Sequence, residues 1–213
     1  MDILQEISTL LQQGRAPKVA ELVQQALDEG AAPGDILETG LLSGMSVVGD
    51  KFKNNEVFVP EVLIAARAMN AGIGVLKPHL AAAGVEAKGT AVIGTVRGDL
   101  HDIGKNLVKM MLEGKGLNVV DLGVDVSPEA FVTAAKENNA QIICCSALLT
   151  TTMGEMKNVV ELANSEGIHG AVKIMVGGAP ITQSFCDSIG ADFYTADAAS
   201  AADVALAICE KRA

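Results

Sequence analysis

One histidine of this chain stands in a pattern that could hold a metal. His101 follows Asp99 by two residues, and Gly98 and Gly104 stand on either side of the pair. A carboxylate at this spacing can bond one ring nitrogen, which fixes the tautomer and makes the other nitrogen a more basic ligand. The glycines give the backbone freedom and let a ligand approach the main chain. A solvated histidine among acidic residues remains the alternative interpretation of this stretch taken alone.

The histidine stretch is expected to connect a strand to a helix. Residues 90–96 are apolar and β-prone, and residues 107–112 have the composition of a helix. In open α/β sheets, ligands bind outside the carboxyl ends of the strands. The sequence therefore predicts that His101 lies where a parallel sheet binds its ligand.

The segment Asp99-Leu100-His101-Asp102-Ile103-Gly104 has the form D-x-H-x-x-G and resembles the cobalamin-binding signature of the methionine synthase type. That resemblance implies that His101 replaces the cofactor's own base as the lower ligand of cobalt, with Asp99 as the residue that orients it. It also implies that the domain takes up the displaced nucleotide tail. The cofactor contacts expected from the motif are Gly98, Asp99, His101, Asp102, Ile103 and Gly104.

Composition excludes several classes of protein. Of the 213 residues, 49% are hydrophobic and 20% charged, which is typical of a globular chain rather than a disordered one. The formal net charge is −10, and only 3% of the residues are aromatic, which argues against a nucleic-acid surface built on basic patches and base stacking. Because no run of about 18 apolar residues occurs, we expect no membrane span.

Cysteine usage and the first residues favour a cytoplasmic protein. Cys144, Cys145, Cys186 and Cys209 show no C-x-x-C spacing, and the first two fall in a predicted strand, where neighbours point to opposite faces. Structural thiols in a reducing cytosol explain them better than disulfides or zinc. The start of the chain lacks the basic and apolar regions of a targeting segment.

Residues 1–83 carry helical periodicity and predict a bundle of four helices. Apolar stripes indicate one helix ending near Gly14, a second beginning near Pro17 and a third running from Pro33 to about residue 52. A fourth helix is expected from Pro60, and Pro78 should kink or end it.

Residues 58–69 are apolar or small on nearly every side, which fits a central bundle helix. The stretch also resembles the helix that caps the upper cobalt face in methionine synthase and its relatives. By that resemblance, Phe58 is the large apolar residue of the cap, and Met69 lies further along the same cofactor-facing helix. Residues 1–83 would then form a movable cap, connected through a glycine-containing linker at residues 84–89.

Residues 90–213 alternate short apolar runs with helical stretches, which predicts an α/β domain with a doubly wound parallel sheet of five strands. The fold class is therefore α/β, with a four-helix bundle followed by a flavodoxin-like, Rossmann-type domain. In the flavodoxin-like strand order, the ends of the first, third and fourth strands converge.

Polar residues and glycines follow these strands. Resemblance places Ser146 and Thr150 against the nucleotide tail and corrin, Leu148 in the same loop, and Thr152 where methionine synthase has a serine that extends the Asp–His network. Caps of the next helix are the plainer interpretation of one or two of these hydroxyls. The remaining expected contacts are Gly177 and Gly178 after the fourth strand, residues 194–197 (Tyr194 to Asp197) after the fifth, and residues 124–126 at the corrin edge after the second.

We interpret the chain as a corrinoid methyl carrier, similar to the cognate corrinoid proteins of methanol, methylamine, glycine betaine and aryl-ether demethylating systems. By that resemblance, the cobalt of a cobalamin or other corrinoid accepts a methyl group from a substrate-specific methyltransferase. A second methyltransferase then passes the group to tetrahydrofolate or a thiol, and a reductive activase restores the reduced cobalt. The chain is then a component of a methyltransferase system rather than a stand-alone catalyst, with His101, Asp99 and Thr152 at its reactive centre.

Three other interpretations stay open. A regulatory cobalamin sensor usually carries an output domain, for which 213 residues leave no room. The small subunit of a cobalamin-dependent mutase resembles only the sheet domain. A flavodoxin-like domain with no ligand at this site is the third. Nucleotide-phosphate loops of the forms G-x-G-x-x-G after a strand and G-x-x-x-x-G-K-[ST] are absent, and His79 and His169 stand in no catalytic motif.

Overall fold

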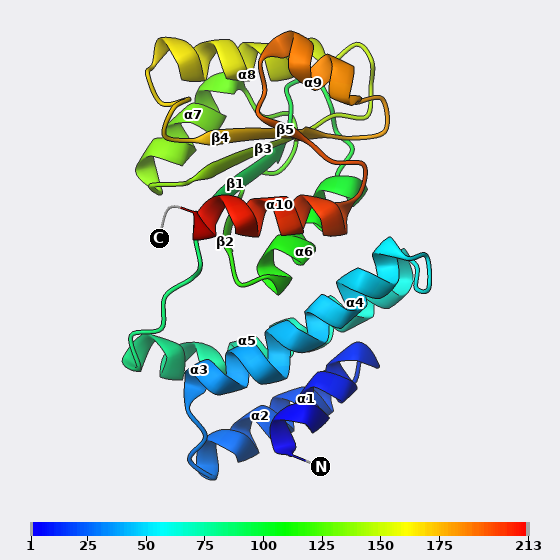
Figure 1. Ribbon diagram of the computed structural model, residues 1–213, viewed down its shortest axis with the longest axis vertical. Helices are drawn as coiled ribbons and strands as arrows, with labels where there is room; N and C mark the ends of the chain where they lie inside the picture. Colours follow the sequence, from blue (N-terminus) through cyan, green and yellow to red (C-terminus); the bar gives the residue numbers. More distant parts are fainter. Residues whose placement is uncertain (1, 212–213) are drawn as a thin grey trace. The chain divides into compact units, whose positions relative to one another are not determined.

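The computed structural model describes residues 2–211 and divides into two compact units between Ala87 and Lys88. The first unit is helical, and the second combines a sheet with helices (Figure 1). The predicted α/β fold class is confirmed.

The helical unit contains four helical stretches, as the apolar stripes predicted. Its elements are α1 (Ile3–Gln12), α2 (Ala16–Asp28), the short α3 (Pro33–Asp35), the π-helical η1 (Ile36–Leu42), α4 (Ser43–Lys53) and α5 (Val59–Ala82). The elements α3, η1 and α4 follow one another without a break and form the predicted third helix. The π-helical turn within it was not predicted, because apolar spacing does not distinguish one extra residue per turn.

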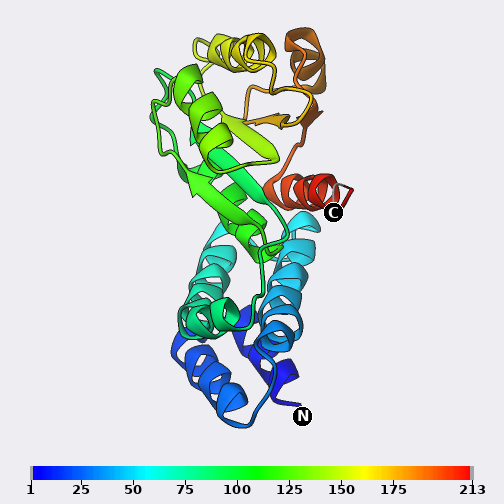
Figure 2. The ribbon, with the colours of Figure 1, turned by 90° about the vertical axis from the view of Figure 1, so that its left-hand side faces the viewer.

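The long helix α5 is the centre of the helical unit and packs along α2 (Figure 2). A side chain at Gly72 would lie 2.8 Å from Leu41 and 3.1 Å from Val19, so α5 approaches its neighbours closely. Pro78 does not end the helix, which continues to Ala82 because a proline near a helix end removes only one backbone hydrogen bond. By length and composition alone, α5 is the one helix within residues 2–211 that could cross a membrane, but a buried core helix meets the same criteria.

The second unit is a five-stranded parallel sheet covered by helices on both faces. Its elements are β1 (Thr90–Thr95), α6 (Ile103–Gly114), β2 (Asn118–Asp121), α7 (Pro128–Glu137), β3 (Ile142–Ser146), α8 (Gly154–Ser165), β4 (Lys173–Gly177), α9 (Gln183–Ile189), β5 (Phe193–Tyr194) and α10 (Ala198–Glu210). The strand order β2-β1-β3-β4-β5 is the flavodoxin-like order that we predicted. Helices α6 and α10 cover one face of the sheet, and α7, α8 and α9 cover the other (Figure 1).

The central strand β3 is buried on both faces. Cys144 and Cys145 lie in this strand, and all four cysteines are buried thiols that form no disulfide within residues 2–211. Burial raises the pKa of the Cys144 thiol to about 12, so this thiol is protonated at neutral pH. These cysteines therefore fill space in the core, as small apolar side chains do.

The register of the sheet brings three strand ends together. Thr95 of β1 lies opposite Ser146 of β3, which in turn lies opposite Gly177 of β4. The loops that follow these three strands therefore begin side by side at one edge of the sheet.

Candidate functional site

The loop after β1 begins with a tight turn. The amide of Asp99 donates to the carbonyl of Val96 at 3.1 Å, and Gly98 adopts a φ of +81°. A positive φ at the third position is what a type II turn requires, and glycine adopts it without strain. At the other end of the loop, the carboxylate of Asp102 accepts from the Asn106 side chain at 3.0 Å, at the start of α6.

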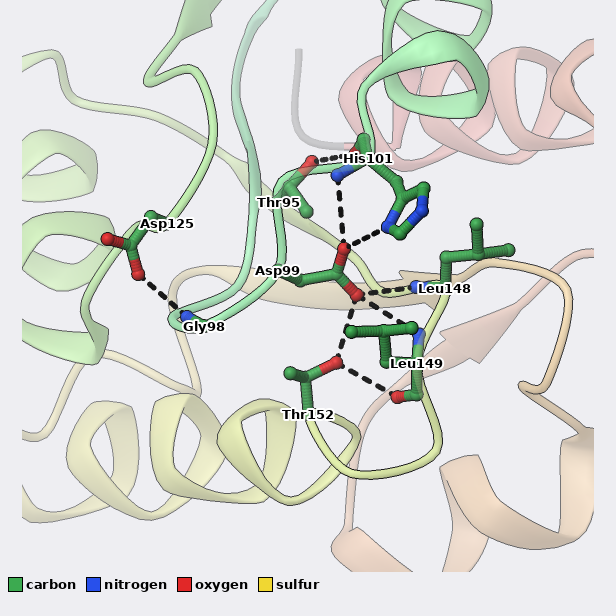
Figure 3. Close-up of polar contacts among 8 residues, drawn as sticks. All are labelled: Thr95, Gly98, Asp99, His101, Asp125, Leu148, Leu149 and Thr152. Atoms are coloured by element: carbon green, nitrogen blue, oxygen red, sulfur yellow. Dashed lines mark hydrogen bonds and ion pairs between the residues drawn. The ribbon is translucent and has the colours of Figure 1, made fainter.

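Asp99 holds the ring of His101. Its Oδ1 lies 2.8 Å from Nδ1 of the imidazole and also accepts from the His101 amide at 3.1 Å (Figure 3). A carboxylate acceptor at Nδ1 selects the tautomer that carries its proton there, so Nε2 presents a lone pair. No described residue bonds Nε2, and the His101 side chain is 52% exposed. The site therefore offers one oriented nitrogen ligand to a partner from outside the chain.

The second oxygen of Asp99 is held from the loop after β3. Oδ2 accepts from the amides of Leu148 at 2.8 Å and Leu149 at 3.1 Å, and from the hydroxyl of Thr152 at 2.9 Å (Figure 3). The Asp99 side chain is fully buried. Burial alone would raise its pKa, but the hydrogen bond from the Leu148 amide and those from His101 and Leu149 outweigh that effect and hold the pKa well below its usual range. Asp99 is therefore a buried carboxylate that stays charged.

Two hydrogen bonds of the site were not predicted from the sequence. The hydroxyl of Thr95, fully buried at the end of β1, donates to the carbonyl of His101 at 2.8 Å. Asp125, expected only near the corrin edge, accepts from the Gly98 amide at 2.7 Å (Figure 3). Both contacts involve the main chain of the histidine loop, which no residue pattern reveals.

The surroundings of His101 suit a large apolar ligand. Leu100 and Ile103 are 71% and 77% exposed, and Leu148 and Leu149 are also exposed on the neighbouring loop. A side chain at Gly104 or Gly177 would meet nothing within 4 Å, so the backbone borders open space at both positions. Exposed apolar side chains beside an oriented imidazole fit a corrin ring bound through its metal.

The donor set indicates how a metal would be held. Within residues 2–211, no group of three or more His, Cys, Asp or Glu side chains could bind a metal ion. A site with one imidazole suits a metal whose other ligands come from a macrocycle rather than from the protein. The residues present therefore fit the corrinoid that the sequence pattern implies.

The other predicted contacts in the sheet unit lie at the same edge. Ser146 ends β3, the exposed Thr150 lies in the loop after it, and Gly177 ends β4. Gly178 has a φ of +130°, and a side chain there would overlap the carbonyl of Ala147, so only glycine fits. These residues border the loops around His101 without a hydrogen bond to it.

Tyr194 and Asp197 follow at the end of the sheet. Tyr194 is half-buried in β5. The carboxylate of Asp197 caps α10, where it accepts from the Ser200 amide at 2.8 Å and from its hydroxyl at 2.8 Å. Asp197 therefore has a structural role in starting α10.

Two predicted contacts belong to the helical unit. Phe58 precedes α5 with its side chain 64% exposed, and its amide donates to the Glu61 carboxylate at 3.0 Å. Met69 lies in the middle of α5 and is fully buried. Of the two, Phe58 is therefore the residue with surface to offer a ligand.

Comparisons with known families match both units. Residues 89–207 match a family described as a B12 binding domain, and residues 3–77 match a second family with the same description.

Relatives of similar length are corrinoid proteins. The chain is 41% identical to a corrinoid protein of Desulfitobacterium hafniense (strain Y51), with 99% of each chain covered. It is 49% identical to trimethylamine corrinoid protein 1 of Methanosarcina mazei over 82% of both chains. It is 45% identical to dimethylamine corrinoid protein 2 of Methanosarcina acetivorans, over 94% of this chain and 93% of the relative.

Solved structures agree with these relatives. A chain of the methanol:cobalamin methyltransferase complex MtaBC from Methanosarcina barkeri superposes with a TM-score of 0.89 at 33% identity, covering 98% of this chain and 80% of that one. A cobalamin-binding protein from Desulfitobacterium hafniense DCB-2 superposes with a TM-score of 0.79 at 29% identity, covering 100% and 99%.

Proposed function

The chain belongs to the corrinoid proteins, whose B12-binding domains match both of its units, and on that premise we propose that it carries a methyl group between two methyltransferases. A substrate-specific methyltransferase loads the group, and a second one delivers it to tetrahydrofolate or a thiol. A reductive activase keeps the cobalt in its active state. The choice of methyl donor belongs to the first partner.

The residues of the site have distinct tasks in this proposal. The bound corrinoid supplies a cobalt nucleophile that takes up and gives up the methyl group. His101 holds the cobalt through Nε2, and Asp99 keeps the imidazole in the required tautomer and orientation. The Leu148 and Leu149 amides and the Thr152 hydroxyl keep Asp99 charged and fixed. The protein thus provides ligation and burial, while the cofactor provides the chemistry.

One observation carries the proposal. An imidazole with Nδ1 bonded to a buried carboxylate and Nε2 open to the surface stands among exposed apolar side chains at the carboxyl edge of the sheet. The cofactor-facing surface is proposed to include Gly98, Asp102, Ile103, Gly104, Ser146, Leu148, Thr150, Gly177, Gly178, Tyr194 and Asp197.

We also propose, from the family resemblance, that residues 90–213 hold the cofactor while residues 1–83 cover and protect it. Residues 84–89 connect them, and the proposed covering helix is α5, which contains Met69 and directly follows Phe58. A covering element that excludes water protects a reactive intermediate from side reactions.

A label-transfer experiment tests the carrier function. The protein is loaded with hydroxocobalamin, reduced, methylated with radiolabelled iodomethane and freed of excess reagent. It is then incubated with a thiol-directed or a tetrahydrofolate-directed methyltransferase and its acceptor. We expect the label to leave the protein and appear on the acceptor while the corrinoid stays protein-bound. Label that remains on the protein with both enzymes, or moves only with released corrinoid, would contradict the proposal.

A further inference from the structure

Asp125 adopts a backbone conformation that needs an explanation. It lies between β2 and α7 with a φ of +55°, in the left-handed region that residues other than glycine rarely adopt. Asp and Asn tolerate this region better than most residues, but the conformation persists only where the surroundings impose it.

The surroundings that impose it are the turn before His101. The Asp125 carboxylate accepts from the Gly98 amide at 2.7 Å (Figure 3). The Asp125 amide donates to the Asp99 carbonyl at 3.0 Å. One residue therefore bonds both ends of the Gly98–Asp99 dipeptide. A type II turn leaves the amide at its third position unbonded within the turn, and the carboxylate supplies that missing acceptor.

Asp125 is itself fixed by the sheet. The pairing of β1 with β2 continues beyond the strands, since the Thr95 amide donates to the Gly123 carbonyl at 2.9 Å and the Val126 amide to the Thr95 carbonyl at 2.9 Å. Asp125 stands between these two contacts. The sheet edge therefore extends through Asp125 to the turn that carries Asp99.

We propose that Asp125 is a positioning residue for the metal ligand: it fixes the Gly98–Asp99 turn, and through Asp99 it fixes the ring of His101. It acts on the main chain and need not touch the cofactor. This inference rests on the proposed role of His101. Without the carboxylate, the turn gains freedom, Asp99 holds the ring less firmly in one orientation, and histidine ligation weakens.

Two substitutions separate the hydrogen bond from the backbone strain. Asp125→Gly adopts the positive φ easily but has no acceptor for Gly98, whereas Asp125→Asn keeps an acceptor oxygen and tolerates the same φ. Glu129→Gln is the matched control. Glu129 is an exposed carboxylate that pairs with the side chain of Arg97 in the same turn at 3.0 Å, but it does not bond the main chain of the turn.

The measurement is electron paramagnetic resonance of the Co(II) form after reconstitution, in which the nitrogen splitting reports the histidine-bound fraction. Protein labelled with ¹⁵N-histidine distinguishes this nitrogen from that of the cofactor's base. Substituting a residue that supports a metal ligand typically lowers metal affinity about 10- to 100-fold. We therefore expect Asp125→Gly to lower the ratio of histidine-bound to histidine-free cobalt by about 10-fold. Asp125→Asn and Glu129→Gln should stay near the wild-type ratio.

A second readout needs no cofactor. In the protein without corrinoid, the Gly98 amide should exchange its hydrogen faster in Asp125→Gly than in Asp125→Asn, while thermal unfolding checks that both variants fold. A wild-type ratio in Asp125→Gly, or an equally low ratio in Asp125→Asn, would overturn the inference. Absence of histidine splitting in the wild-type protein would instead overturn the proposed role of His101.

Discussion

Asp99 combines full burial with a negative charge, and hydrogen bonding makes that combination possible. Hydrogen bonds from five groups reach its two oxygens: the His101 amide and ring, the Leu148 and Leu149 amides and the Thr152 hydroxyl. Because these groups stabilise the charged form, the carboxylate can orient an imidazole without sharing its proton. The ligand geometry at His101 thus depends on donors from two separate loops.

Asp99→Asn should leave part of this network unsatisfied. An amide side chain has one acceptor oxygen, so its NH₂ group must face either His101 or the donors of the β3–α8 loop. We expect a loss of about 1–3 kcal/mol in the free energy of unfolding, since buried donors lose their acceptor. In the loaded protein, weaker electron donation through His101 should make the Co(II)/Co(I) potential less negative.

Chemical denaturation and spectroelectrochemistry measure these two effects. Glu129→Gln is the matched control, because Glu129 is an exposed carboxylate that pairs with the Arg97 side chain at 3.0 Å and lies outside the Asp99–His101 network. A potential and an unfolding free energy that both stay at wild-type values in Asp99→Asn would refute the orienting role of Asp99.

The lowered pKa of Asp99 predicts a pH dependence of stability. Its pKa lies below the ordinary value of 3.8 in the folded protein, so the folded state binds the proton less readily than the unfolded state. The stability that it contributes is complete above the unfolded pKa and is lost as the pH falls through the folded pKa. Below about pH 4, the wild-type protein should therefore lose stability more steeply than Asp99→Asn. Parallel curves in urea titrations across this range would contradict the prediction.

At the residue scale, the sequence predicted side-chain partners better than main-chain partners. The spacing of Asp99 and His101 indicated their contact, because a carboxylate two residues before a histidine in the same loop can reach a nitrogen of its ring. The hydrogen bonds from the Leu148 and Leu149 amides could not be predicted, since every residue except proline has an amide donor and only the fold determines its direction. The hydrogen bonds of Asp125 could not be predicted for the same reason, because its partners are main-chain groups of Gly98 and Asp99.

At the scale of elements, an ion pair between a buried lysine and a partly exposed aspartate attaches α6 to the end of β2. Lys105, only 3% exposed, donates to the Asp121 carboxylate at 2.6 Å, and Lys109 reaches the same carboxylate at 3.2 Å from the next turn. Burial raises the pKa of Asp121, but the hydrogen bonds from Lys105, the Gly123 amide and Lys109 together outweigh it, so the pKa is lowered overall. Because α6 starts just after His101, this pair also anchors the end of the histidine loop.

Lys105→Met should destabilise the fold more than Lys109→Met does. It removes the buried partner, but Asp121 is partly exposed and keeps Lys109, so we expect a loss below the about 3–5 kcal/mol that is typical of a fully buried pair. Lys109→Met tests the same carboxylate from a side chain that is more exposed, where ion pairs contribute about 0–1 kcal/mol. Urea unfolding of the two variants gives the comparison. Equal losses, or a neutral Lys105→Met, would show that burial does not set the strength of this pair.

Element types followed from sequence periodicity, while element ends followed from local chemistry. The strand order emerged because repeated βα units have few compact arrangements. Ser127 starts α7 as its cap, and its hydroxyl accepts from the Ala130 amide at 3.2 Å. The π-helical η1 was not predicted, because apolar spacing does not distinguish it from an α-helix. Pro78 was expected to kink or end α5, and the helix continues past it to Ala82.

At the scale of the whole molecule, the hydrogen-bonded network around His101 lies entirely in the sheet unit. Every partner of Asp99 and of the Gly98 turn falls between Thr95 and Thr152. The helical unit contributes a separate family domain at residues 3–77. Ligation and protection of the cofactor are therefore separable in our proposal.

A chain beginning at Lys88 tests this separation. We expect it to bind hydroxocobalamin, because the His101 network is complete without the helical unit, and to show faster oxidation of the reduced cofactor in air. Phe58→Ala in the full chain is the milder variant, since it removes an exposed side chain from the proposed covering helix. A folded truncated chain that fails to bind, or whose reduced cofactor is as long-lived as in the full chain, would contradict the covering role.

The central claim is that Nε2 of His101 binds the cobalt, and one spectrum tests it most directly. The protein is produced with ¹⁵N-histidine, reconstituted with unlabelled hydroxocobalamin and reduced to Co(II) for electron paramagnetic resonance. We expect the nitrogen splitting to change from the triplet of ¹⁴N to the doublet of ¹⁵N, and His101→Ala to lose the doublet. A triplet that persists in the labelled wild-type protein would show that the cofactor's own base remains the ligand, and would contradict the account.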